Sequence, residues 1–160
     1  MMDVQLFRID DRLIHGQVVI GWVKYLKSKR IILCDDDVVQ NEWEKELYLS
    51  CVPGHLEAIV FNLNEAAAYL LNKLQQNNKT IVLVKSPIVL AKLVDTGYIP
   101  KQVNLGGVHF AENRKKVLPY LFLSPSEIEC IKSLQNKGIC LYCQDIPTSK
   151  KYKTSDILKD

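Results

Sequence analysis

The segment with the strongest structural signal reads Arg8-Ile9-Asp10-Asp11-Arg12-Leu13-Ile14-His15-Gly16-Gln17-Val18. Upstream, the short run from Val4 to Ile9 is partly alternating and compatible with a β-strand. Downstream, apolar residues recur from Val18 to Leu26 at a spacing of about 3.6 residues, which is typical of an amphipathic helix. Residues 10–16 are therefore predicted to be a loop that joins a strand to a helix.

This loop combines groups that bind an anion with a nucleophile. The first backbone N–H groups of a helix lack partners within the helix and lie at the positive end of its dipole, so they attract phosphate. Arg12 adds a permanently charged donor, and the neutral imidazole of His15 is able to attack phosphorus. Asp10 or Asp11 is expected to fix the tautomer of that imidazole. The alternative is a structural loop, in which His15 caps the helix and Arg12 pairs with Asp10 on the surface.

The whole segment closely resembles the active-site signature of the IIB component of mannose-family sugar phosphotransferase systems. The resemblance extends to Trp22, to Asn104-Leu105-Gly106-Gly107-Val108-His109 and to residues 138–147, so it covers nearly the whole chain. It implies that His15 accepts a phosphoryl group from a phosphohistidine of a IIA partner and passes it to a hexose or amino sugar held by membrane IIC and IID partners. It also implies that Arg12 and Asp10 support this histidine and that Nδ1 is the usual site of modification, although the sequence itself does not distinguish the two ring nitrogens.

The resemblance carries expectations about partners. Contact with IIA is expected around His15, with the apolar residues Leu13 and Ile14 near the loop. Family members commonly form dimers or larger assemblies, so a homo-oligomer is compatible with the sequence, but no pattern defines an interface. The basic run Lys150–Lys153 is expected to be a solvated tail, with contact to an anionic membrane or partner as the alternative.

Length and composition fit a single carrier domain that spans residues 1–160. With 160 residues, of which 48% are hydrophobic and 24% charged, the chain is able to bury a substantial core, and its net charge of +3 does not indicate nucleic-acid binding. No apolar run approaches the roughly 20 residues that span a bilayer, and the polar start argues against a secretory signal. We therefore expect a cytoplasmic protein that meets the membrane only through partners. No IIA domain is expected in front of the first strand.

Strand-like and helical patterns alternate along the chain. Runs compatible with β-strands lie at 4–9, 30–34, 56–61, 80–84, 102–105, 117–123 and 138–145. Helical patterns lie at 18–26, 38–51, 65–75, 87–97 and 125–138. The last of these begins with a capping serine, Ser124, followed by a proline and by a glutamate three residues after the cap. The alternation predicts an α/β domain with a mostly parallel open sheet, helices on both faces and the active loop after the first strand.

Ligands of open α/β sheets bind beyond the carboxyl ends of the strands, where loops distant in sequence meet. His15 is the predicted catalytic residue, and the predicted phosphate-binding residues are Arg12, Asp10, Gly16, Ser86, Gly106 and Gly107. Ser86 either binds phosphate or only caps the helix that begins at Pro87. Gly106 and Gly107 permit close backbone approach, either to the phosphate loop or in a tight turn.

No metal or cofactor is predicted. Asp35, Asp36 and Asp37 follow the second strand, where they either stabilise a helix N-terminus or hold magnesium. A metal is not required, because the donor and the acceptor of the phosphoryl group are both imidazole nitrogens. Arg12 and backbone donors are then sufficient to meet the charge on the phosphate oxygens.

The other histidines and the cysteines receive different interpretations. His55 is predicted at the surface, and His109 is expected to pack or to form hydrogen bonds rather than to act as the nucleophile. Cys140 and Cys143 are three residues apart in a predicted strand, so their side chains should point to opposite faces and not chelate one metal. The remaining cysteines are expected to pack as small apolar residues: Cys34, Cys51 and Cys130.

Two other functions remain open for the same architecture. A nucleotide-binding or other small-ligand module is disfavoured, because no Gly-x-Gly-x-x-Gly follows the first strand and the chain has no Gly-Lys-Ser/Thr phosphate loop. A regulatory protein that keeps the fold but relays no phosphate to sugar is the second alternative. The identity of the transported sugar is not expected to be encoded here, because the sugar binds the membrane component.

Overall fold

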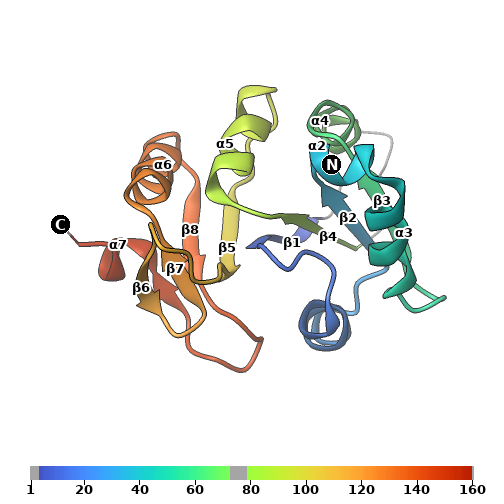
Figure 1. The fold of residues 1–160 in the computed structure, drawn as a ribbon, viewed down its shortest axis with the longest axis horizontal. Helices are drawn as coiled ribbons and strands as arrows, with labels where there is room; N and C mark the ends of the chain where they lie inside the picture. The colour runs from blue at the N-terminus through green and yellow to red at the C-terminus, as the bar shows by residue number, and fades with distance from the viewer. Residues whose placement is uncertain (1–3, 73–78, 160) are drawn as a thin grey trace.

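Parallel strands form the centre of the fold (Figure 1). The computed structural model describes residues 4–72 and 79–159, and in these residues one sheet has the strand order β3-β2-β4-β1-β5-β8-β9. Every neighbouring pair is parallel except β8 and β9. The predicted mostly parallel sheet is confirmed. Its strands are β1 (Val4–Asp10), β2 (Arg30–Cys34), β3 (Glu57–Phe61), β4 (Thr80–Val84), β5 (Gln102–Gly107), β8 (Cys140–Cys143) and β9 (Tyr152–Lys153).

Helices cover both faces of this sheet, as predicted. One face is packed by α4 (Leu63–Leu71), α5 (Pro87–Asp95) and α6 (Pro125–Asn136). The other face is packed by η1 (Gln17–Val23), α1 (Lys24–Leu26), α2 (Asp36–Gln40) and α3 (Glu42–Ser50). Because helices lie on both sides, β2 and β4 are buried along their whole length. A separate hairpin, β6 (Lys115–Leu118) and β7 (Leu121–Leu123), and the short α7 (Thr154–Ile157) complete the fold.

The limits of β2, β4 and α6 follow from local sequence signals. The predicted strands 30–34 and 80–84 coincide with β2 and β4. At the start of α6, the Ser124 hydroxyl accepts from the Glu127 amide while the Glu127 carboxylate accepts from the Ser124 amide. After α6, Gly138 has a φ of 89°, a left-handed conformation that glycine adopts without strain. These features confirm the predicted capping signals of this helix.

Three predicted elements differ from the structure. The pattern at 38–51 forms two helices rather than one, because Asn41 leaves the helical region at φ −112° and ψ 94° and its side chain caps α3 by accepting from the Glu44 amide. The predicted single strand at 117–123 is the two-stranded hairpin β6–β7. The pattern at 18–26 begins as the π-helix η1. The predicted helix 65–75 corresponds to α4, and its last part, residues 73–75, lies outside the described residues.

The sheet ends at a short antiparallel strand rather than a solvated tail, which corrects the expectation for Lys150–Lys153. Tyr152 and Lys153 form β9 beside β8. The ammonium groups of Lys150 and Lys151 each lie 5.1 Å from an aromatic ring centroid, that of Tyr152 for Lys150 and that of Tyr142 for Lys151. Lys150 and Lys151 are exposed, and their charges interact with the aromatic rings of this edge.

The cysteines follow the predictions with one exception. Cys140 is exposed and Cys143 is buried, so the two side chains do lie on opposite faces of β8. Burial raises the pKa of the Cys143 thiol to about 12. Cys34 is buried as expected, whereas Cys51 is exposed, so its prediction as a packed residue is wrong.

Among residues 4–72 and 79–159, none of the helices combines the length and apolar character needed to cross a membrane.

Candidate functional site

The predicted active loop leaves β1 at the carboxyl end of the strand and turns sharply. The Asp11 amide donates to the Gly107 carbonyl at 3.0 Å, and the Leu13 amide donates to the Asp10 carbonyl at 3.0 Å. Leu13 has a φ of 56°, an uncommon conformation for a residue with a branched side chain. Leu13 and Ile14 are buried in the core beneath the loop, so the expectation that they form an apolar contact surface for a partner is wrong.

One buried carboxylate organises the loop. The side chain of Asp10 is 0% exposed and accepts from the Arg12 amide at 3.1 Å, from Arg12 Nε at 3.0 Å and from Arg12 Nη2 at 2.8 Å. Arg8 Nη2 donates to the same carboxylate at 2.9 Å. Nε2 of His15 lies 3.2 Å from Asp10 Oδ2. Asp10 therefore contacts Arg8 in β1 and both Arg12 and His15 in the loop, so the aspartate that contacts His15 is Asp10 and not Asp11.

This environment keeps Asp10 ionised. Burial by itself raises the pKa of the carboxyl group, but hydrogen bonds from His15 and Arg12 and the charge of Arg8 outweigh burial and hold the pKa well below its usual range. Burial in turn lowers the pKa of Arg8, and the charge of Asp10 opposes that effect. An ionised carboxylate accepts hydrogen bonds only, so Nε2 of His15 is the protonated ring nitrogen in this arrangement.

The side chain of His15 stands at the start of η1 and is 17% exposed. Within residues 4–72 and 79–159, its Nδ1 atom has no hydrogen-bond partner. Gly16, the N-cap residue of η1, is exposed, and a Cβ atom there would meet only Ile20 at 3.9 Å. The imidazole is thus held at one nitrogen and accessible to solvent, beside the start of a helix, where the first backbone amides lack partners within the helix.

Arg8 is a part of the site that the sequence did not reveal. It is fully buried, and its Nη1 donates to Asn104 Oδ1 at 2.6 Å and to the Gln144 carbonyl at 3.1 Å. Its Cζ lies 5.6 Å from the centroid of the Trp22 ring. A Cβ atom on Gly106 would lie 1.9 Å from Arg8 Cζ, so any residue other than glycine would force the Arg8 guanidinium to shift. The close backbone approach predicted for Gly106 is therefore an approach to a buried arginine.

Gly107 lies against the loop itself. Its carbonyl accepts from the Asp11 amide, and a Cβ atom added to it would lie 3.0 Å from Arg12 Nη2 and 3.3 Å from Asp10 Oδ2. The structure therefore brings Gly107, Arg12, Asp10 and His15 together. The role of these residues in binding phosphate stays a prediction.

Ser86 takes part in a different cluster. Its hydroxyl accepts from the Val89 amide at 3.2 Å and caps α5, as the second interpretation of this residue predicted. Beside it, Lys85 pairs with Asp35 at 3.2 Å and with Asp37 at 2.8 Å. The Asp35 carboxylate caps α2 by accepting from the amides of Asp37 and Val38. Helix capping and ion pairing thus account for these residues, and phosphate binding by Ser86 remains a prediction.

A third cluster of polar side chains surrounds His109. Nδ1 of His109 lies 2.5 Å from Asp11 Oδ1, and the His109 amide donates to Asp11 Oδ2 at 2.8 Å. Arg114 donates to the His109 carbonyl at 3.0 Å and pairs with the buried Glu127 at 2.8 Å. His109 is 65% exposed and hydrogen bonded, so the hydrogen-bonding interpretation holds and the packing one does not. His55 is exposed, as predicted.

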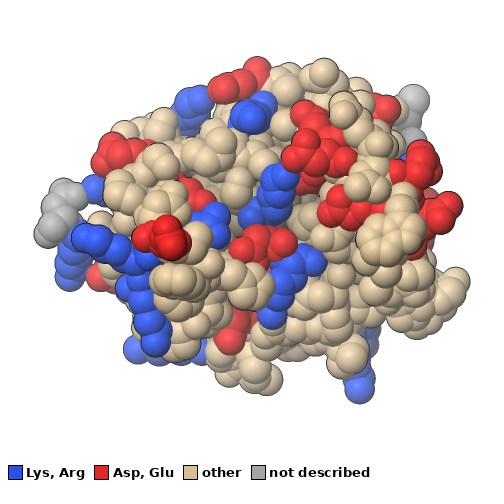
Figure 2. All heavy atoms as spheres, in the orientation of Figure 1, with Lys and Arg blue, Asp and Glu red and all other residues tan. Residues whose placement is uncertain are grey.

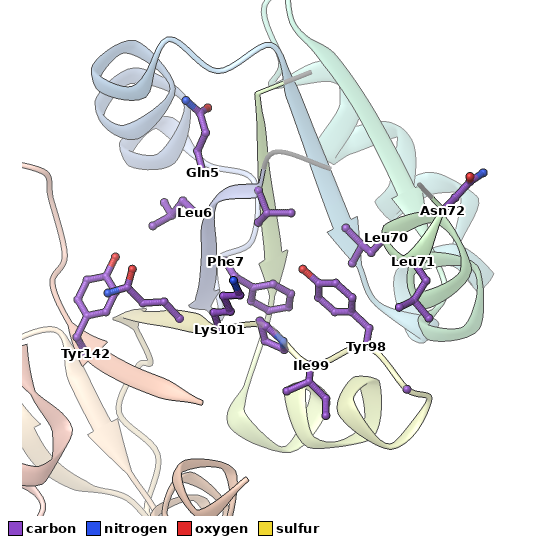
Figure 3. A pocket seen from close by; sticks show the side chains of 14 residues that line it. Gln5, Leu6, Phe7, Leu70, Leu71, Asn72, Tyr98, Ile99, Lys101 and Tyr142 are labelled. Carbon is purple, nitrogen blue, oxygen red and sulfur yellow. The ribbon is translucent and has the colours of Figure 1, made fainter. Parts of the chain in front are cut away.

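A hollow elsewhere in the molecule is separate from this loop. A cavity of about 890 Å³ lies at the start of β1 and β5, where the rings of Phe7 and Tyr98 stack with centroids 6.2 Å apart (Figure 3). His15 follows the opposite, carboxyl end of β1. In residues 4–72 and 79–159, no three or more His, Cys, Asp or Glu side chains are grouped so as to hold a metal ion.

The fold and this loop define a class: a doubly wound α/β domain with a carboxylate-held histidine at the carboxyl end of its first strand. Over residues 4–160 the chain matches the family described as the PTS system sorbose subfamily IIB component. The chain belongs to this family of IIB components of phosphotransferase systems, whose members act as sugar phosphotransferases together with IIA and membrane IIC and IID partners.

Individual relatives agree with this assignment. The chain is 29% identical over its full length to the fructose-specific EIIB component of Bacillus subtilis, covering 98% of that protein. It is 32% identical to the sorbose-specific EIIB component of Klebsiella pneumoniae, over 88% of this chain and 85% of that one. The crystal structure of the IIBSor domain of the K. pneumoniae sorbose permease has a TM-score of 0.90 and 29% identity, covering 98% of this chain and 96% of that one.

Proposed function

We propose that this chain is a cytoplasmic phosphocarrier that takes a phosphoryl group from a phosphorylated IIA partner onto His15. It then transfers the group to a hexose or amino sugar during uptake through membrane IIC and IID partners. The observation that supports this most strongly is the geometry of His15, whose Nε2 contacts the buried Asp10 while Nδ1 has no partner among the described residues.

The chemistry follows from the tautomer. With its proton on Nε2, the ring has its lone pair on Nδ1, and this is the nitrogen that we propose attacks phosphorus. The bond between phosphorus and the donor imidazole of IIA breaks as the new P–Nδ1 bond forms. The His15 ring gains positive charge in this step, and the ionised Asp10 at 3.2 Å stabilises that charge.

Arg12 has the second role in the proposed mechanism. Its guanidinium is 32% exposed and tied to Asp10, so it lies beside His15 with part of its surface open to solvent. A guanidinium donates several hydrogen bonds in a fixed plane, which suits the oxygens of a phosphoryl group. In the second transfer a sugar hydroxyl attacks phosphorus and releases its proton to solvent, the P–Nδ1 bond breaks, and His15 returns to its starting tautomer with Nε2–H on Asp10.

The test is phosphate labelling of the purified chain. Phosphoenolpyruvate, enzyme I, HPr and a IIA partner should label the unaltered protein with acid-labile, base-stable phosphate. His15→Ala should abolish the labelling, whereas His55→Ala and His109→Ala should retain it. Persistent labelling of His15→Ala would refute the assignment.

A second measurement separates a carrier from a regulatory protein of the same family. The labelled chain should lose its phosphate to a sugar when membranes that contain the IIC and IID partners are added. Labelled protein that keeps its phosphate with every hexose and amino sugar tested would support the regulatory alternative. Comparing sugars in this assay also identifies the substrate.

A further inference from the structure

The outer face of α3 is an unpartnered helix surface with an exposed aromatic side chain. None of the α3 residues is buried, and its two largest apolar side chains, Trp43 and Leu47, are 73% and 49% exposed. They are four residues apart and therefore share one face of the helix, which also presents the exposed Glu42 and Glu46. Tryptophan in such a position is characteristic of the residues that dominate binding at protein interfaces.

This face is strongly acidic. Between Asp35 and Ser50 the chain has six carboxylates and one lysine, although its net charge is +3. Figure 2 shows the acidic side chains gathered on the right, over α2, α3 and α4, and lysines and arginines gathered at the lower left, over the β6–β7 hairpin. The two ends of the molecule therefore attract partners of opposite charge.

The acidic face lies at the same end of the sheet as the active loop. β2 is parallel to β4, and β4 is parallel to β1, so α2, which follows β2, begins at the edge where His15 follows β1, and α3 begins two residues after α2 ends. With strands about 4.8 Å apart, β2 and β1 are separated by roughly 10 Å. A large partner that reaches His15 is able to cover the outer face of α3 at the same time.

The charge of this face selects the kind of partner. Cytoplasmic segments of membrane proteins are rich in lysine and arginine, whereas the cytoplasmic membrane surface itself is anionic and repels carboxylates. We propose that the α3 face, formed by Glu42, Trp43, Glu46 and Leu47, docks a basic cytoplasmic segment of the membrane partner that holds the sugar. This inference rests on the proposed function and adds to it the surface that the membrane partner uses.

Vesicle binding tests the surface without any phosphoryl transfer. The unphosphorylated chain should co-sediment with vesicles that contain the IIC and IID partners and not with protein-free anionic vesicles. Glu42→Lys combined with Glu46→Lys, and separately Trp43→Ala, should each weaken this binding by about tenfold. The double lysine variant should also lose most of the salt dependence of binding.

The matched control, Glu129→Lys with Asp156→Lys, makes the same charge change at exposed positions on α6 and α7 and should bind like the unaltered chain.

Transfer kinetics complete the test and separate it from the proposed function. Labelling by phosphorylated IIA should be unchanged in the α3 variants, while sugar phosphorylation at limiting carrier concentration should fall by about tenfold and recover at saturation. Unweakened vesicle binding, a parallel loss of IIA labelling, or a change in self-association of the α3 variants would each overturn the inference. If the unaltered chain is not labelled on His15, the proposed function fails, and vesicle binding still decides the role of α3.

Discussion

Asp10, the last residue of β1, and Asp11, the residue after it, each contact one histidine, but in different surroundings. Asp10 is completely buried and contacts His15, Arg8 and Arg12, whereas the side chain of Asp11 is 21% exposed and contacts His109 and Arg114. Both carboxylates meet a ring nitrogen of their histidine. Burial therefore makes the two carboxylates differ in how much their loss costs in stability. A charge removed from a buried cluster leaves its partners uncompensated, whereas water replaces a lost contact at the surface.

The largest effect is expected from neutralising the buried carboxylate. Asp10→Asn leaves the buried Arg8 without its counterion, so the free energy of unfolding should fall by about 3–5 kcal/mol in urea denaturation. Labelling of His15 should fall by about a hundredfold, because the amide neither fixes the tautomer nor stabilises the charged ring. Asp11→Asn should change the free energy of unfolding by less than about 1 kcal/mol. Equal losses in the two variants would show that burial does not make Asp10 more important than Asp11.

The pH dependence of stability sharpens the same comparison. The pKa of Asp10 is lowered in the folded state, so its contribution is fully present above the unfolded value of about 3.9 and is lost as the pH falls through the folded pKa. The difference in unfolding free energy between the unaltered chain and Asp10→Asn should therefore be constant near neutral pH and shrink below about pH 4. Urea titrations at several pH values measure it. A difference that grows in acid would show that the folded pKa is raised.

A smaller effect is expected from the glycine that faces Arg8. In Gly106→Ala the new Cβ would lie 1.9 Å from Arg8 Cζ, so the guanidinium must shift away from Asn104 or Asp10. The free energy of unfolding should fall by about 1–3 kcal/mol. Gly54→Ala is the control, because nothing lies within 4 Å of its added Cβ. Thermal unfolding of the two variants measures the difference, and equal stability of Gly106→Ala and Gly54→Ala would contradict the prediction.

The smallest effect is expected at the exposed histidine. His109→Ala removes the Nδ1 contact to Asp11 but leaves the amide of residue 109 able to donate to the same carboxylate. Stability should change by less than about 1 kcal/mol, and the rate of labelling by IIA should change by less than about threefold. A larger loss of labelling would mean that the contact between His109 and Asp11 contributes to phosphoryl transfer and not only to the structure of the loop.

The sequence was sufficient for elements with strong local signals. β2 and β4 are continuous apolar runs, and α6 begins with a serine, a proline and a glutamate at capping positions, so their limits follow from nearest-neighbour chemistry. The division between α2 and α3 was missed because the apolar pattern continues across Asn41. The side chain of Asn41 caps the second helix there, a signal that the sequence does contain.

The site was predictable only in part, for a physical reason. Asp10, Arg12 and His15 lie within one loop, so their proximity is local. Arg8 was missed because its partners, Asn104 and Gln144, are 96 and 136 residues away in the chain and meet it only when β5 and β8 have joined the sheet. An arginine inside the predicted first strand was the available sign of such a cluster, because a charged side chain in a buried strand needs partners.

The two-residue strand β9 has a consequence for solubility. Without it, β8 would be an uncovered parallel edge, and its free amides and carbonyls would template strands from other molecules. β9 occupies part of that edge, and Lys150, Lys151 and Lys153 surround it with positive charge that repels an identical edge. Removing this segment should turn a dispersed protein into one that precipitates through intermolecular sheet growth.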